Sequence, residues 1–151
     1  MGTPRKIFRK VKSFALMPLA TKWLFFEAVF TSAYVKALLL FFPFRKVTPW
    51  LGSPQQQNGG APPTDNPALV KKIQFAIKLC DRYTPWPTEC YTRSLTAKIM
   101  LKRRKMPSIL YFGFRKDNTG KLDGHSWLQC SGMTVTGYCD FSKYQVHSSF
   151  C

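Results

Sequence analysis

The chain has 151 residues, with 23 Lys and Arg against seven Asp and Glu, and a formal net charge of +16 at pH 7. This length suits one domain with a single core and excludes two full-sized domains. A surface this basic attracts phosphates, anionic lipids or acidic peptides, and the net charge alone does not choose among these partners.

The five cysteines argue against a disulfide-linked or zinc-stabilised domain. Their number is odd, and none stands in a Cys-x-x-Cys pair with a matching second pair. Both kinds of domain need complementary cysteine spacing, so we expect free thiols, no metal and no other cofactor. Free thiols, and the lack of a small-residue cleavage site after the basic residues 5–12, predict a cytoplasmic protein.

Residues 23–42 form an apolar run that is long enough to cross a bilayer, interrupted by Glu27 and Lys36 and ended by Pro43. Two charges near the middle of a spanning helix are costly unless they are paired, so the sequence favours a helix packed on the domain or on a partner. Interfacial membrane contact and a true span stay open, because Lys and Arg flank the run on both sides.

Residues 52–67 are rich in Gly, Pro, Gln and Asn and carry almost no apolar side chains. Such a segment cannot bury enough surface to order itself, so we interpret it as a linker. The chain therefore divides into a basic and apolar helical segment at residues 1–51, the linker at 52–67, and a compact domain at 68–151.

Two helices are predicted at the start of this domain. Asn66 and Pro67 supply a cap and a first-turn proline for a helix whose apolar residues recur every three or four positions, and which stops before Pro85. Thr88 is the predicted N-cap of the second helix. This cap places Cys90 near the second helical position.

After Met106-Pro107 the apolar pattern changes to period two, which is typical of strands. Turn residues at 117–120 and 131–132 separate the strand-like segments. An antiparallel meander is the expected arrangement. The strands are predicted at residues 109–114, 122–130, 133–138 and 144–150.

Cys90 on the second helix and His125 on the second strand could form a nucleophile and its base. A thiol at a helix N-terminus meets the positive end of the helix dipole, which favours the thiolate. An imidazole nearby can hold or move the proton. From the residues alone, a buried and inert cysteine is the alternative.

Several segments around these two residues resemble one protein family. They are Cys90-x-x-Arg93-Ser94-Leu95, the basic helix end and proline at 101–107, Phe112-Gly113-Phe114-Arg115-Lys116, and Gly124-His125-Ser126-Trp127-Leu128. Together they resemble the transglutaminase-like leader peptidases of lasso-peptide biosynthesis, the microcin J25-processing family. Residues 39–45 and 50–52 also look like that family's opening segment, so the resemblance covers nearly the whole chain apart from the linker.

The resemblance implies an α+β fold with a papain/transglutaminase-like cysteine peptidase core, in which a nucleophile helix precedes a small antiparallel sheet. It also implies that the protein removes the leader from a ribosomally made precursor. Cys90 would attack the scissile carbonyl, and His125 would take the thiol proton and pass one to the leaving amine. A separate leader-peptide-binding protein would recognise the precursor, and a macrolactam synthetase would act next.

The third catalytic residue is where this sequence departs from the family. Family members often carry Asp at the position that is Gly137 here. Asp140 is the nearest acid in the stretch that follows and is the predicted residue that orients His125. Asp123 is its rival, and a dyad completed by a backbone carbonyl stays open.

Two other classes of function are also compatible with the sequence. A nucleic-acid-binding protein would explain the net charge, but the chain has no zinc finger, helix-turn-helix or RNP-like aromatic motif. A non-catalytic, membrane-associated scaffold of the same fold is supported only by the missing Asp at position 137.

Overall fold

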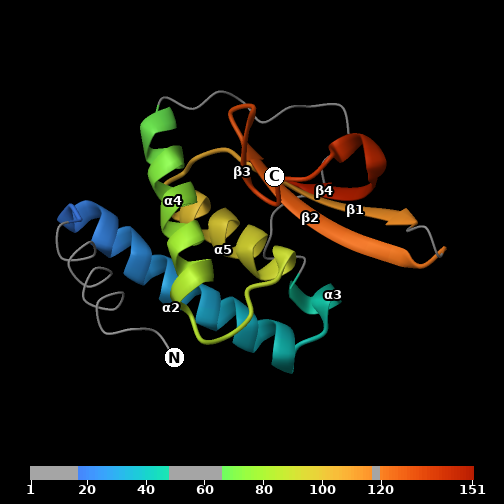
Figure 1. Ribbon diagram of the computed structural model, residues 1–151, viewed down its shortest axis with the longest axis horizontal. Coiled ribbons are helices and arrows are strands. Elements are labelled where there is room, and N and C mark those ends of the chain that lie inside the picture. Colours follow the sequence, from blue (N-terminus) through green and yellow to red (C-terminus); the bar gives the residue numbers. More distant parts are fainter. Residues whose placement is uncertain (1–16, 48–65, 117–119) are drawn as a thin grey trace, which may run out of the picture.

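The computed structural model describes residues 17–47, 66–116 and 120–151 (Figure 1). Helices α2, α4 and α5 lie together beside a small antiparallel sheet, which confirms the predicted α+β fold. In chain order the elements are α2 (Leu19–Phe41), α3 (Phe44–Val47), α4 (Pro67–Tyr83), α5 (Cys90–Arg103), β1 (Ile109–Lys116), β2 (Leu122–Cys130), β3 (Met133–Thr136), the 3-10 helix η2 (Phe141–Lys143) and β4 (Gln145–Phe150).

Helix α4 begins as its sequence predicts. The Asn66 side chain accepts a hydrogen bond of 3.0 Å from the backbone N–H of Leu69, and Pro67 occupies the first helical position. One face of α4 is buried in the core, which includes Val70 and Ile73. A side-chain cap and a one-sided apolar face are local signals, so the sequence alone locates this helix.

The start of α5 differs from the prediction by one residue. Glu89 is the N-cap and Cys90 is the first helical residue, rather than Thr88 and the second position. Thr88 does not cap the helix because its hydroxyl donates to the carboxylate of Asp81 on α4. Asp81 also pairs with Arg93 at 3.2 Å, so this carboxylate ties the beginning of α5 to the end of α4.

The strand order is β3-β2-β1-β4, so the predicted simple meander is wrong for the last strand. The first three strands do follow one another, but β4 pairs with β1. The edge of β1 offers a strand of eight residues, whereas β3 has only four. The longer edge provides more backbone partners, and the connection through η2 carries the chain across the sheet to reach it.

Helix α2 packs on α4 and α5, which is the arrangement that the sequence favoured for residues 23–42. It buries Leu24, Ala28 and Val35 in the same core as the helices of the 68–151 domain. By length and composition alone α2 could also cross a membrane. Residues 52–65 of the predicted linker lie outside the described residues, and the proposed domain boundaries stay predictions.

The two charges inside the apolar run are both paired. Glu27 accepts hydrogen bonds from Arg104 at 2.6 Å and from Arg103 at 3.4 Å, and Lys36 lies 3.5 Å from Glu89. Burial raises the pKa of the Glu27 carboxyl, but the bonds and charges of Arg104 and Arg103 outweigh this effect and hold the pKa below its usual value. The charges therefore attach α2 to α5 instead of disrupting the helix.

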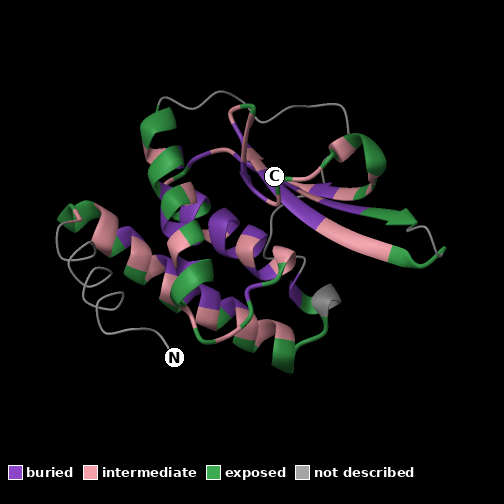
Figure 2. Cartoon of the chain, in the orientation of Figure 1, coloured by how far each residue is buried: buried purple, intermediate pink, exposed green. Residues whose placement is uncertain are grey.

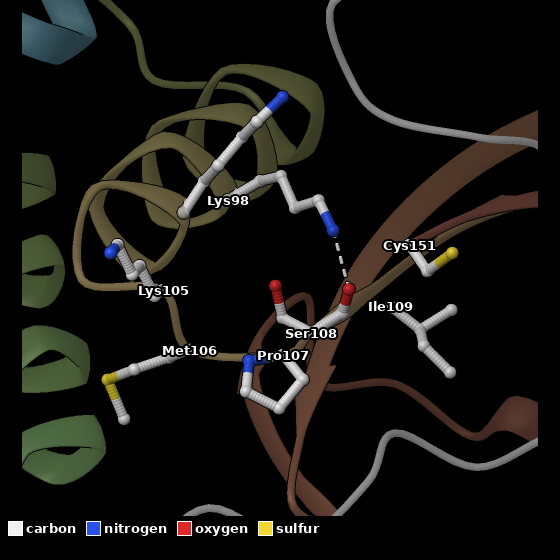
Figure 3. A pocket seen from close by; sticks show the side chains of 8 residues that line it. Lys98, Lys105, Met106, Pro107, Ser108, Ile109 and Cys151 are labelled. Atoms are coloured by element: carbon white, nitrogen blue, oxygen red, sulfur yellow. Dashed lines mark hydrogen bonds between the residues drawn. The ribbon is translucent and has the colours of Figure 1, made fainter.

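Lys98 is a buried charged residue on α5, with 5% of its surface exposed. Its Nζ donates to the carbonyl of Ser108 at 2.5 Å, beside a pocket of about 440 Å³ between the end of α5 and the start of β1 (Figure 3). Burial lowers the pKa of the Lys98 ammonium to about 8, even though negative charge at Cys151 acts in the opposite direction. The folded chain therefore holds this proton less tightly than the unfolded chain does.

We expect the substitution Lys98→Met to change how stability depends on pH. Between a pKa of about 8 in the fold and the ordinary 10.5, the unfolded wild-type chain binds more protons, so wild-type stability rises with pH in this window. Relative to the variant, the wild-type free energy of unfolding should rise by up to about 3 kcal/mol across it. Urea denaturation of both proteins at several pH values measures this difference.

The matched control is Lys71→Met, which removes an exposed lysine from α4. Its stability difference from wild type should not change over the same pH window. A Lys98→Met difference that is equally flat would contradict the buried ammonium.

Candidate active site

Cys90 is half-buried at the first position of α5. Ser94, one turn further along the helix, donates to the carbonyl of Ser126 at 3.2 Å and shares a hydrogen bond of 3.0 Å with the hydroxyl of Thr136. Residues four apart lie on the same side of a helix. Ser94 therefore fixes the Cys90 end of α5 against β2 and the end of β3.

Tyr91 and Phe112 mark the face of the sheet that packs on α5. Their rings stack with centroids 5.6 Å apart, and Phe112 is paired with Ser126 across β1 and β2. Because side chains alternate along a strand, Ser126 shares this face and His125 projects from the opposite one. His125 and Cys90 can therefore meet only around the edge of β2.

That edge of β2 is free of strand pairing beside His125. β3 pairs with β2 from Leu128 to Cys130, and in the described part of the chain no strand continues along the edge toward His125. The segment that follows β3 lies there instead. Gly137 in this segment bonds to His125. The segment after β3 thus contacts the candidate base at this edge.

His125 is held by the backbone of Gly137. Its Nε2 lies 3.1 Å from the Gly137 carbonyl oxygen. A carbonyl oxygen only accepts hydrogen bonds, so Nε2 must carry the proton in this bond. In the neutral imidazole Nδ1 is then unprotonated and able to accept a proton, which is the tautomer that a general base needs.

Gly137 cannot be replaced by a larger residue in this backbone. Its φ is +72°, in the left-handed region that favours glycine. A Cβ at this position would collide with the carbonyl of Ser126 and would lie 2.8 Å from Cα of Trp127. An Asp side chain at this position therefore does not fit this backbone, and the carbonyl of Gly137 bonds to the imidazole instead.

The structure does not bring Asp140 to His125, contrary to the expectation from the sequence. Its carboxylate accepts a hydrogen bond from Ser142 at 2.6 Å and pairs with Lys143 at 3.2 Å. The hydrogen bond from Ser142, together with Lys143, lowers the pKa of the Asp140 carboxyl. The rival Asp123 is also engaged elsewhere, since it accepts from Arg115 at 2.8 Å.

Two aromatic rings surround the imidazole. The Trp127 ring stacks with His125 at 6.3 Å between centroids, on the side of the sheet that strand alternation predicts. It is 3% exposed and also stacks on Tyr111, so it packs in the core and shields the imidazole. The Tyr144 ring lies 5.3 Å from His125. The aromatic walls limit the directions in which the imidazole can turn.

Within the described residues no hydrogen bond joins Cys90 to His125. Catalytic hydrogen bonds are often long in a free enzyme and tighten when substrate binds. The sequence did not single out Tyr144. This residue lies beside His125 because it directly precedes β4, which pairs with β1 rather than with β3. The sequence analysis did allow a backbone carbonyl as the partner of His125. The only sequence feature that pointed to this partner was the glycine at position 137.

A family model for the transglutaminase-like superfamily matches residues 36–149, from within α2 to near the end of β4. Searches of curated proteins and of solved structures gave no match. The matched range covers most of the chain and contains Cys90, His125 and Gly137. Proteins of this superfamily are in general cysteine peptidases and transglutaminases. On this match and this fold, the chain belongs to the transglutaminase-like superfamily.

Proposed function

We propose that this protein is a cysteine endopeptidase that removes the leader peptide from a lasso-peptide precursor. Two observations carry the chemistry: Cys90 stands at the first position of α5, and His125 is held through Nε2 by the Gly137 carbonyl. A thiol at a helix N-terminus and an imidazole with a free Nδ1 are the parts of a cysteine nucleophile.

In the proposed reaction, His125 Nδ1 takes the proton of the Cys90 thiol as the sulfur attacks the scissile carbonyl carbon. The backbone N–H of Cys90, at the helix N-terminus, donates to the developing oxyanion. The imidazolium then passes its proton to the leaving amine as the peptide bond breaks, which gives a thioester on Cys90. Water hydrolyses the thioester with His125 as base, and the free thiol returns.

The substrate assignment rests on the resemblance of the segments around Cys90 and His125 to lasso-peptide leader peptidases. Under this proposal a leader-peptide-binding protein recognises the precursor, and a macrolactam synthetase acts on the product, both in the cytoplasm. The basic end of α5 gives these partners an electrostatic target, because Arg103 is exposed beside Lys102 and Lys105.

The missing Asp at position 137 does not favour a non-catalytic scaffold. A triad carboxylate has two tasks: it holds the imidazole in one tautomer, and it stabilises the imidazolium. The Gly137 carbonyl performs the first task at 3.1 Å from Nε2. The missing Asp was the one sequence feature that supported a scaffold, and the Gly137 carbonyl takes the place of its side chain.

The direct test is cleavage of the precursor in the presence of its leader-binding partner, followed by mass spectrometry of the leader fragment. Cys90→Ala and His125→Ala should each lower the single-turnover rate by at least a thousandfold, because each removes a group that acts in bond cleavage. Asp140→Asn should retain the wild-type rate within about threefold, since among the described residues its carboxylate bonds to Ser142 and Lys143 and not to His125.

Cleavage that survives Cys90→Ala would overturn the mechanism. A large loss in Asp140→Asn, with the fold intact, would return the orienting role to that carboxylate. Wild-type cleavage of an unrelated peptide at the same rate as the precursor would refute the substrate assignment but not the cysteine chemistry.

A second prediction concerns Gly137. Replacing it with Ala forces a side chain into a left-handed conformation and against β2, so we expect a loss of more than about 1 kcal/mol in the free energy of unfolding. Because the Gly137 carbonyl must shift, kcat should fall more than KM rises. Gly132→Ala is the control, with the same φ of +72° but no atom within 4 Å of the added Cβ.

The two glycine variants separate strain from positioning. Both should lose stability, but only Gly137→Ala should lose cleavage when both are assayed where they are fully folded. Equal cleavage by the two variants would show that the Gly137 carbonyl does not position His125.

A third prediction concerns thiol reactivity at neutral pH. Cys90 should react with iodoacetamide faster than Cys80, Cys130 and Cys139, because it stands at a helix N-terminus. Burial raises the pKa of each of those three thiols. The exposed Cys151 sets the rate of an ordinary accessible thiol. Peptide mapping by mass against time gives all five rates, and a Cys90 rate no higher than that of Cys139 would refute an activated nucleophile.

A further inference from the structure

The outer side of α2 carries no charged residue. Every exposed residue of this helix is apolar, and Figure 2 shows the exposed residues recurring along α2 between the buried ones. The most exposed side chains include Phe41 at 80%, Trp23 at 74% and Phe30 at 73%. We call this set the α2 stripe: Leu19, Ala20, Trp23, Phe26, Phe30, Tyr34, Ala37, Leu40 and Phe41.

The α2 stripe follows one side of the helix because most of its residues recur every three or four positions. A helix of this length extends about 34 Å at 1.5 Å per residue. An ordinary surface helix carries charged and polar residues on its outer side. A continuous apolar stripe of this length, with aromatic rings as its largest members, indicates a surface that binds something.

Two charged residues of α2 lie beside the stripe and face the domain. Glu27 bonds to Arg104 and Arg103, and Lys36 pairs with Glu89. A hollow of about 340 Å³ next to the stripe is lined by Trp23, Phe30 and Arg103 among others. Arg103, with 59% of its side chain exposed, therefore presents positive charge at the border of the aromatic rings.

The chain as a whole is strongly positive. Each of the five acidic residues in the described ranges lies in an ion pair with a Lys or Arg: Glu27, Asp81, Glu89, Asp123 and Asp140. The sequence that precedes α2 adds five Lys and Arg in residues 1–16 and no acid. A partner surface must accordingly be apolar where it meets the stripe and anionic around it.

We propose that the α2 stripe lies in the interface of an anionic membrane, with the helix parallel to the membrane plane. Trp, Tyr and Phe are the residues that favour the boundary between headgroups and acyl chains, and basic residues beside them bind anionic headgroups. This inference does not depend on the proposed peptidase activity.

Two other occupants fit the structure less well. A second copy of the chain would bring together two molecules of net charge +16, which repel each other. A membrane-spanning α2 would have to leave α4 and α5, which would expose the core around Val35 and separate Glu27 from Arg104. Only the in-plane arrangement keeps the inner side of α2 in the core while covering its outer side.

Membrane binding in this manner would also fix the position of the candidate active site. Glu89, which pairs with Lys36 of α2, directly precedes Cys90. The nucleophile is thus attached to the helix that lies in the interface, so the site would stay close to the membrane surface. Substrates would reach it from the layer of solution next to the bilayer.

The test is co-sedimentation of the full chain with vesicles of phosphatidylcholine alone and of phosphatidylcholine with 30 mol% phosphatidylglycerol (about one anionic lipid in three, to give a negative surface). We expect binding to the anionic vesicles to be at least tenfold stronger and to weaken with added salt. The double variant Trp23→Ser, Phe30→Ser should bind at least tenfold more weakly, because it removes two exposed rings from the stripe.

The matched control is Leu122→Ser on β2, which removes an apolar residue that is 66% exposed and lies outside α2. It should bind within about twofold of wild type, since no part of the stripe changes. Circular dichroism and precursor cleavage without vesicles should be unchanged in the double variant, which separates membrane binding from folding and from the proposed activity.

Four outcomes would overturn the proposal. Two are equal binding by wild type and the double variant, and equal binding to the two kinds of vesicle. Another is retention of the bound protein after an alkaline carbonate wash, which would indicate a spanning helix. The last is a lipid-free dimer in analytical ultracentrifugation that the double variant dissociates, which would assign the stripe to a second copy.

Discussion

The close approach of Gly137 to the backbone of β2 determines the geometry of the candidate site. Because residue 137 is a glycine, the chain after β3 can lie directly against the unpaired edge of β2. A Cβ at this position would collide with the carbonyl of Ser126. The carbonyl of Gly137 is thereby placed 3.1 Å from His125 Nε2. One glycine in a left-handed conformation thus positions the candidate base.

Paired charges explain why the apolar N-terminal helix belongs to the fold. In an isolated α2, Glu27 and Lys36 would interrupt a run otherwise suited to lipid. In the folded chain the first bonds to Arg104 and Arg103 and the second to Glu89. The inner side of α2 is thus fixed by core packing and ion pairs, and every residue left exposed is apolar. The same helix therefore has one side that packs in the core and one apolar side that is exposed.

Features of the fold that depend on neighbouring residues could be predicted from the sequence, whereas those that depend on distant segments could not. The cap at Asn66, the first three strands, and the placement of Cys90 near the start of a helix and of His125 on the second strand follow from local spacing. Thr88 was misassigned because Asp81, seven residues away on another helix, takes its hydroxyl. Asp140 was chosen as the nearest acid, but Ser142 and Lys143 hold its carboxylate. The pairing of β4 with β1 joins segments that are far apart along the chain, which no local pattern encodes.

A backbone carbonyl in the place of a triad carboxylate suits the proposed cysteine nucleophile better than it would suit a serine. A hydrogen bond to a neutral carbonyl contributes about 1 kcal/mol, against about 2 kcal/mol for a bond to a charged group, so the Gly137 carbonyl stabilises an imidazolium less. A serine hydroxyl needs a strongly assisted base, whereas a thiol gives up its proton far more readily and is intrinsically more nucleophilic. The helix N-terminus at Cys90 adds favourable interaction with the thiolate itself. For such a nucleophile, holding the imidazole in the right position matters more than raising its basicity with a carboxylate. A fixed backbone carbonyl is enough to hold it.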